Sequence, residues 1–224
     1  AVDAAAVKAN AEYLTQRETA ERLIELAKGT GTPWVTLSGG NPVMWELADL
    51  VHLLHEAGLA VAVETQGSLY KEWLEKCQMV VVSPKGPGMG EECDIGKLEE
   101  FFVKKTLAEQ MQLKQFGKSW GSMAVKVVIF DQRDFEFALE VKGLMDDTMG
   151  LDTSNGMFFL SLGNPTPPIL GPDYQPQVDG SVDVSALLDR YRTLLEDFVT
   201  DERFKHAKFL PQMHVLVYGN ETGR

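Results

Sequence analysis

Short apolar runs alternate with longer stretches of helical periodicity along most of the chain. The longer stretches place apolar residues three and four positions apart, as at Leu47, Leu50, Val51 and Leu54, which is the spacing of one helix face. Because the polar connections are short, the pattern predicts an α/β fold with parallel strands joined by right-handed crossovers. The runs predicted to be strands are 34–37, 59–63, 79–82, 125–130 and 157–162.

Helix boundaries are predicted from capping residues. Thr15 with Glu18 three positions later predicts a capping box, and Gly29 is expected to end that helix. Asp131 is expected to cap another helix, which carries Phe135 toward the core. The predicted helices span 15–29, 47–58, 69–74, 98–116, 131–141 and 184–199.

Composition favours a soluble, cytoplasmic protein of one domain. The chain has 224 residues, 44% of them hydrophobic, so a single domain over 1–224, with a closing C-terminal element at 207–224, can bury a full core. The net charge of −12 repels a phosphate backbone, so nucleic acid is not an expected partner. No apolar run approaches the ~20 residues of a membrane span. Cys77 and Cys93, the only cysteines, are expected to be free thiols.

Four polar clusters directly follow predicted strands. Gly39 and Gly40 can adopt positive φ and let the backbone approach a ligand, while Pro42 suits a first helical turn. Because the carboxyl ends of parallel strands converge, we expect one pocket lined by all the clusters. Taken alone, the glycine segment also fits a plain strand-to-helix turn, and Lys85 also fits a solvated loop lysine. The clusters are Gly39–Pro42, Glu64–Gly67, Ser83–Lys85 and Gly163–Asn164.

The histidines have ordinary explanations, with one exception. His52 and His55 lie three apart on a predicted helix beside Glu56, but no third ligand is evident, so we expect surface or half-buried residues and no metal pair. His214 lies in an otherwise apolar run, where an unpaired imidazole would cost free energy.

With these motifs in order, the chain resembles the radical S-adenosylmethionine enzymes and, within that superfamily, the 7-carboxy-7-deazaguanine synthases. The Gly-Gly-Asn-Pro and Ser-Pro-Lys loops, closed by Leu-Pro-Gln-x-His, are the specific part of the likeness. The resemblance implies a partial, open parallel β/α barrel. The segments that carry it are TLSGGNP at 36–42, AVETQGS at 62–68, VVSPKGPGMG at 81–90, KVVIFDQRDFEFA at 126–138 and LPQMHVLVYGN at 210–220.

The resemblance also implies roles for individual residues, none of them a general acid or base. The double-glycine loop would hold the amino group of S-adenosylmethionine, and Ser83 and Lys85 would lie against its ribose and carboxylate. The implied cofactor-binding residues are Gly39, Gly40, Asn41, Glu64, Ser83, Lys85 and Ser161. The residues implied for the substrate, 6-carboxy-5,6,7,8-tetrahydropterin, are Thr65, Gln66, Gln212 and His214.

The implied reaction is a lyase step in queuosine and 7-deazapurine biosynthesis. A reduced 4Fe–4S cluster would cleave S-adenosylmethionine to a 5′-deoxyadenosyl radical, which starts a ring contraction of the pterin to 7-carboxy-7-deazaguanine with loss of ammonia. The cofactors carry this chemistry while the protein orients them. A homodimer and an external electron donor, such as flavodoxin or ferredoxin, are expected by the same likeness.

The chain departs from the family in its metal ligands. Family members carry three closely spaced cysteines for the cluster, followed by an Asp-Thr element tied to Mg²⁺, upstream of the first helix. Ala1-Val-Asp-Ala resembles the residues directly after that element, so the first strand and the cluster loop are expected to be missing. Cys77 and Cys93 do not share the tight loop that a cluster needs, so no metal ligand is assigned.

Two other functions remain open. The chain is expected to be inactive alone, and it could be a catalytically silent fragment or remnant that binds a nucleoside or pterin, or only dimerises. A phosphate-binding α/β enzyme with Gly39 and Gly40 as its cradle is weaker, because neither a P-loop lysine nor G-x-G-x-x-G follows.

Overall fold

The computed structural model describes residues 12–119, 121–150, 157–164 and 182–218. Within these ranges six strands form one sheet in sequential order, and every neighbouring pair is parallel. This confirms the predicted α/β class with an open, partial barrel, because β1 and β6 are not paired with each other. The strands are β1 (Trp34–Leu37), β2 (Ala60–Thr65), β3 (Met79–Val82), β4 (Ser122–Ile129), β5 (Phe158–Leu162) and β6 (Lys208–Phe209).

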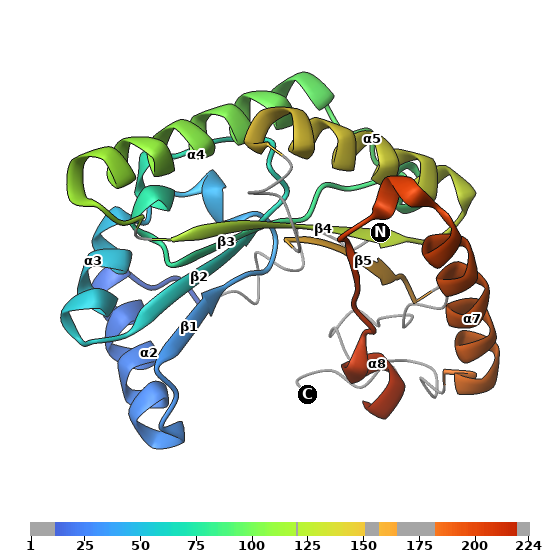
Figure 1. Ribbon diagram of the computed structural model, residues 1–224. Helices are drawn as coiled ribbons and strands as arrows, with labels where there is room; N and C mark the ends of the chain where they lie inside the picture. Colours follow the sequence, from blue (N-terminus) through green and yellow to red (C-terminus); the bar gives the residue numbers. More distant parts are fainter. Residues whose placement is uncertain (1–11, 120, 151–156, 165–181, 219–224) are drawn as a thin grey trace.

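Helices fill the connections between the strands. Figure 1 shows α2, α3, α4, α5 and α7 following one another along one side of a curved sheet. The α-helices are α2 (Gln16–Thr30), α3 (Ala48–Glu56), α4 (Ile95–Phe116), α5 (Gln132–Met149), α7 (Val184–Thr200) and α8 (Met213–Tyr218). Short 3-10 helices are η1 (Pro42–Met44), η2 (Glu72–Lys76), η3 (Pro87–Met89) and η4 (Glu202–Phe204). In the part of the chain so described, no helix has the length and apolar character that crossing a membrane requires.

The start of α2 follows the sequence prediction and its end does not. The backbone N–H of Glu18 donates to Thr15 Oγ1 at 3.2 Å, and the Glu18 carboxylate accepts from the Thr15 N–H at 2.8 Å, which completes the capping box. The prediction that Gly29 ends the helix is wrong. Gly31, with φ of 70°, is the C-cap, because a helix tolerates an internal glycine whereas its terminus favours a left-handed residue.

The limits of β1 and β3 match the prediction, and those of β2, β4 and β5 differ from it by one to three residues. β2 continues through Glu64 and Thr65, for which the sequence pattern predicts a loop, and β4 begins three residues early, at Ser122. The short helix predicted at 69–74 is the 3-10 helix η2. The proline-rich segment at 165–168 and the alanine-rich start of the chain lie outside the described residues.

The two faces of the sheet are buried to different extents. One face packs against the helices through residues such as Val63, Val82 and Val125, all with no exposed area. The opposite face carries Trp34, which is 45% exposed, and the half-buried Glu64. Alternation of side chains along each strand separates these two sets. The helix-covered face forms the core, and the other face carries the charged strand residues Glu64 and Lys126.

The C-terminal unit packs onto the last strands of the sheet. β6 pairs with β5, and the N–H of Leu210 donates to the carbonyl of Leu160 at 2.7 Å. The rings of Tyr191 and Phe209 meet edge to face, with centroids 5.5 Å apart. This edge-to-face contact joins α7 to the terminal strand.

Candidate cofactor and substrate site

The loops after β1 and β2 are joined by side-chain hydrogen bonds at the carboxyl end of the sheet. The hydroxyl of Thr65 donates to Asn41 Oδ1 at 2.9 Å, and Asn41 Nδ2 donates to the hydroxyl of Ser68 at 3.2 Å. Thr65 is 2% exposed, and its hydroxyl also accepts the N–H of the buried Gly67 at 3.3 Å, so loss of this hydroxyl would leave a buried donor unpaired. This network fixes the amide of Asn41 beside the double glycine.

The double glycine adopts the conformation that its sequence favours. Gly39 and Gly40 have φ of 87° and 57°, in the left-handed region. Both residues are exposed, and a β-carbon added to either would meet no atom within 4 Å. The backbone conformation, and not lack of space, is therefore the reason for glycine at these two positions.

The loop after β3 is attached to the end of β2. The N–H of Ser83 donates to the carbonyl of Thr65 at 2.7 Å, and Ser83 is 4% exposed. Lys85 follows after the buried Pro84 and is half-buried. The predicted cofactor residues of three consecutive strand ends therefore lie along one edge of the sheet.

Glu64 points to the opposite face from Thr65 and is paired with a lysine. Its Oε1 atom lies 2.6 Å from Nζ of Lys126 on β4. The side chains of Glu64 and Lys126 are 34% and 25% exposed, so solvent screens their attraction in part. The pair supplies one anionic and one cationic group on the less buried face.

The other predicted residues occupy separate places. Gln66 is half-buried at the end of β2, and Ser161 is 2% exposed on β5. The backbone N–H of Gln212 donates to the hydroxyl of Tyr191 at 2.9 Å, beyond β6. His214 belongs to α8, and its side chain lies outside the described part. The structure therefore links Asn41 to the Thr65 hydroxyl. Among the hydrogen bonds of the described residues, none connects Ser161 or Gln212 to that network.

The two cysteines do not suit an iron–sulfur cluster. Cys77 is fully buried, and burial raises the pKa of its thiol to about 12. Burial also raises the pKa of Cys93. Metal ligation requires the thiolate, which both environments disfavour. Among the described residues, no group of three His, Cys, Asp or Glu side chains could hold a metal ion.

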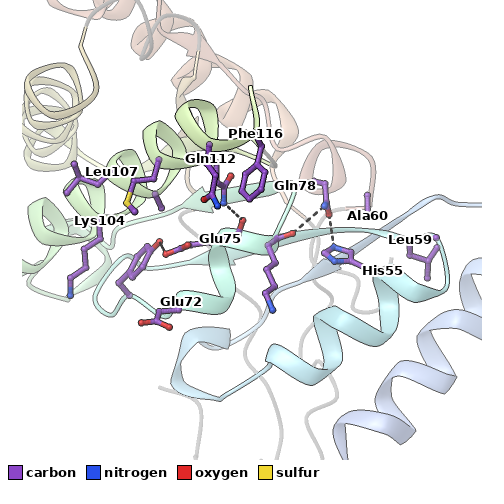
Figure 2. A pocket seen from close by; sticks show the side chains of 16 residues that line it. His55, Leu59, Ala60, Glu72, Glu75, Gln78, Lys104, Leu107, Gln112 and Phe116 are labelled. Carbon is purple, nitrogen blue, oxygen red and sulfur yellow. Dashed lines mark hydrogen bonds between the residues drawn. The ribbon is translucent and has the colours of Figure 1, made fainter. Parts of the chain in front are cut away.

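A large cavity lies away from the predicted residues. It has a volume of about 1390 Å³ and runs between α3, η2 and α4 to the beginning of β2 and β3. Figure 2 shows Gln78 accepting from His55 at one side, at 3.1 Å, and Gln112 donating to the Glu75 carbonyl at the other, at 3.2 Å. Its lining contains none of the predicted ligand residues, and α/β proteins place their chemistry beyond the carboxyl ends of the strands. We therefore do not assign the cofactor to this cavity.

Sequence reasoning missed two participants in this arrangement. Lys126 is charged yet lies within an apolar strand, between Val125 and Val127, and that interruption was a signal for an exposed face. Ser68 had no signal beyond following a glycine, because its importance comes from contact with a residue 27 positions away.

Two curated proteins are similar to the chain over most of its length. The 7-carboxy-7-deazaguanine synthase of Bacillus cereus (strain ATCC 14579) is 31% identical over 211 residues, which cover 94% of this chain and 76% of the relative. The 7-carboxy-7-deazaguanine synthase of Bacillus subtilis (strain 168) is 28% identical over 217 residues, or 96% and 79%. No protein-family profile matches the chain.

Solved structures with a similar fold come from Streptococcus suis SuiB. SuiB alone superimposes with a TM-score of 0.58 at 16% identity over 92% of this chain, and SuiB bound to S-adenosylmethionine gives 0.57 at 16% over 93%. The chain spans just under half the length of these structures, 46% and 47%, and at this identity the likeness concerns the fold. The identity and coverage of the B. cereus relative decide the family: the chain belongs to the 7-carboxy-7-deazaguanine synthases.

Proposed function

We propose that the protein takes part in the conversion of 6-carboxy-5,6,7,8-tetrahydropterin to 7-carboxy-7-deazaguanine with release of ammonia. Membership of a family whose relatives carry that product in their names supports the proposal. The observation that carries it is the hydrogen-bonded network of Asn41, Thr65 and Ser68 beside the double glycine, because it is built where α/β proteins bind ligands.

S-adenosylmethionine fits the polar groups along this edge of the sheet. The exposed backbone of Gly39 and Gly40 and the amide of Asn41 would hold its amino group. Ser83 would contact the ribose, and the Lys85 ammonium would face the carboxylate as a charge-assisted donor. When bound and reductively cleaved, this cofactor supplies a radical that abstracts hydrogen from the substrate.

The proposed work of this chain is binding, orientation and exclusion of water. Glu64, Ser161 and Lys126 would line the less buried face of the sheet beneath the cofactor, and Lys126 would hold Glu64 in place. Gln66, Thr65, Gln212 and His214 remain the proposed substrate residues, with Thr65 acting through Asn41. No proton transfer by a side chain is required, since the cofactor carries the hard chemistry.

We assign no residue of this chain as a ligand of the iron–sulfur cluster. Cys77 and Cys93 are its only cysteines; Cys77 is buried in the core, and the half-buried Cys93 packs against it. We therefore expect the chain alone to bind S-adenosylmethionine and the pterin without cleaving the former. A homodimer and an external electron donor are further expectations from the resemblance.

Calorimetric titration of the chain with S-adenosylmethionine tests the proposed site. We expect saturable binding that Asn41→Ala and Lys85→Met each weaken about tenfold, the loss of one hydrogen bond to a charged group. His52→Ala is the control, because His52 is exposed on α3 and pairs only with the surface Glu56 among its described ion pairs. Equal binding of adenosine and S-adenosylmethionine would favour a nucleoside-binding remnant instead.

Anaerobic iron and sulfide reconstitution tests the assignment of the cluster. We expect no stable 4Fe–4S absorption and no 5′-deoxyadenosine on reduction. A stable brown protein that forms 5′-deoxyadenosine would contradict the expectation that this chain alone is inactive.

A further inference from the structure

Asp134 at the start of α5 has a fully buried carboxylate that binds two separate loops. Its Oδ1 atom accepts the N–H of Gly88 at 2.8 Å, from the loop after β3. Its Oδ2 atom accepts the N–H of Phe130 at 2.8 Å and the N–H of Asp131 at 3.3 Å, beyond the end of β4. The bond to Asp131 belongs to the capping box of α5, but the bond to Gly88, 46 residues away, has no role in the helix.

The loop around Gly88 is shaped to fit this carboxylate. A β-carbon on Gly86 or on Gly88 would collide with the Asp134 carboxylate, so both positions need glycine for reasons of space. Asp134 has no exposed area and Gly86 is buried. A buried carboxylate is stable only when its hydrogen bonds are made, so the loop and the acid hold each other in place.

The segment that carries Lys85 is therefore fixed at both ends. At its start, Ser83 is bonded to the carbonyl of Thr65, and at its end Gly88 is bonded to Asp134. Pro84 and Pro87 restrict φ between these points. Few main-chain rotations remain that could move the α-carbon of Lys85.

We propose that Asp134 is a positioning residue for Lys85. Its carboxylate holds the loop 84–90 against the end of β4 and so places the lysine for an anionic ligand group. The role of Lys85 toward S-adenosylmethionine rests on the function proposed above, whereas the fixing of the loop by Asp134 is independent of it.

The variant Asp134→Asn, compared with a capping control, distinguishes the fixing of the loop 84–90 from the capping of α5. One carboxylate oxygen serves Gly88 and the other serves Phe130, so an amide in either orientation directs its NH₂ group at a backbone donor. Asp131→Asn is the matched control, because Asp131 caps the same helix from the exposed side and makes no described bond to the loop. Hydrogen exchange measured by mass spectrometry should become at least tenfold faster in peptides covering 84–90 in Asp134→Asn and stay unchanged there in Asp131→Asn. Equal exchange in this loop for wild type and Asp134→Asn would overturn the proposal.

A double-mutant cycle on S-adenosylmethionine affinity tests the link to Lys85. Asp134→Asn should weaken binding about tenfold in the wild-type background, a typical loss for one charge-assisted contact, and should have no further effect in Lys85→Met. Additive losses in the cycle would mean a general structural effect and would overturn the positioning role. If the wild-type chain does not bind S-adenosylmethionine, the proposed function fails, while the exchange measurement still decides whether Asp134 fixes the loop.

Discussion

The ammonium of Lys126 lies 2.6 Å from the carboxylate of Glu64, although their strands β4 and β2 are not neighbours. The pair therefore spans β3 on the face of the sheet that the helices leave less covered. Because both side chains keep part of their surface in solvent, the pair can exchange partners with a ligand more easily than a buried one could.

Breaking this pair should cost little stability in the free chain. Lys126→Met keeps most of the unbranched side chain and removes the charge, so we expect a loss of about 1 kcal/mol, the upper range for partly exposed pairs. That loss corresponds to a fall of about 2–4 °C in the melting temperature for a chain of this size. Thermal unfolding at low and high salt measures it, and an unchanged melting temperature at low salt would contradict it.

Replacing Gly67, at the end of β2, should lower the free energy of unfolding for two separate reasons. Its φ is 79°, and an added β-carbon would lie 2.6 Å from Val82 Cγ1 and 2.7 Å from Leu98 Cδ1. Gly67→Ala then combines left-handed strain of roughly 1–2 kcal/mol with overpacking of roughly 1–3 kcal/mol. Gly31→Ala is the control, with φ of 70° and no atom within 4 Å, and should show only the strain. Urea unfolding compares the two, and equal losses would rule out the steric contribution.

Removing the hydroxyl of Thr65 should lower the free energy of unfolding more than removing that of Ser68. Thr65→Val keeps the shape but removes the donor to Asn41 Oδ1 in a buried place, which costs about 1–3 kcal/mol. Ser68→Ala removes an acceptor at an exposed residue, where water can replace it. Chemical unfolding of both variants measures the two losses. A larger loss in Ser68→Ala would mean that the network is held mainly through Ser68.

Alkylating reagents should label the buried Cys77 more slowly than Cys93. The raised pKa of Cys77, about 12, keeps it as the unreactive thiol at pH 8, and the thiolate gains population only as pH rises toward that value. The folded chain keeps a Cys77 proton that the unfolded chain loses above its pKa of about 8.5, so the free energy of unfolding falls as pH rises from there toward 12. Iodoacetamide labelling followed by peptide mass spectrometry should therefore modify Cys93 first. Earlier labelling of Cys77 in the native chain at pH 8 would be inconsistent with this environment.

The fold was predictable because its strands are apolar runs with glycine and proline at their ends. Val35, Val80 and Val125 lie in strands as expected. The end of β2 was misjudged because Glu64 is charged, yet it extends the strand on the less buried face, where a charge costs little. Gly29 was misjudged because composition alone does not reveal which of two nearby glycines takes positive φ.

The candidate site was predictable only as a set of loops. Gly39, Asn41 and Ser83 stand out through local turn chemistry, which is a short-range signal. Lys126 and Asp134 act through contacts that span 62 and 46 residues, so their importance arises from the topology of the sheet. The large cavity beside α4 likewise has no local sequence pattern, since it is formed by three separate elements.

The two attachments of the segment 83–88 have a consequence for the energetics of ligand capture. A main chain that is already ordered loses little entropy when a ligand arrives. The remaining cost lies in the Lys85 side chain, whose rotamers carry about 2 kcal/mol, and in the ligand itself. Association with an anionic group at this point should therefore resemble docking to a rigid surface, and its rate should depend on ionic strength more than on any rearrangement of the loop.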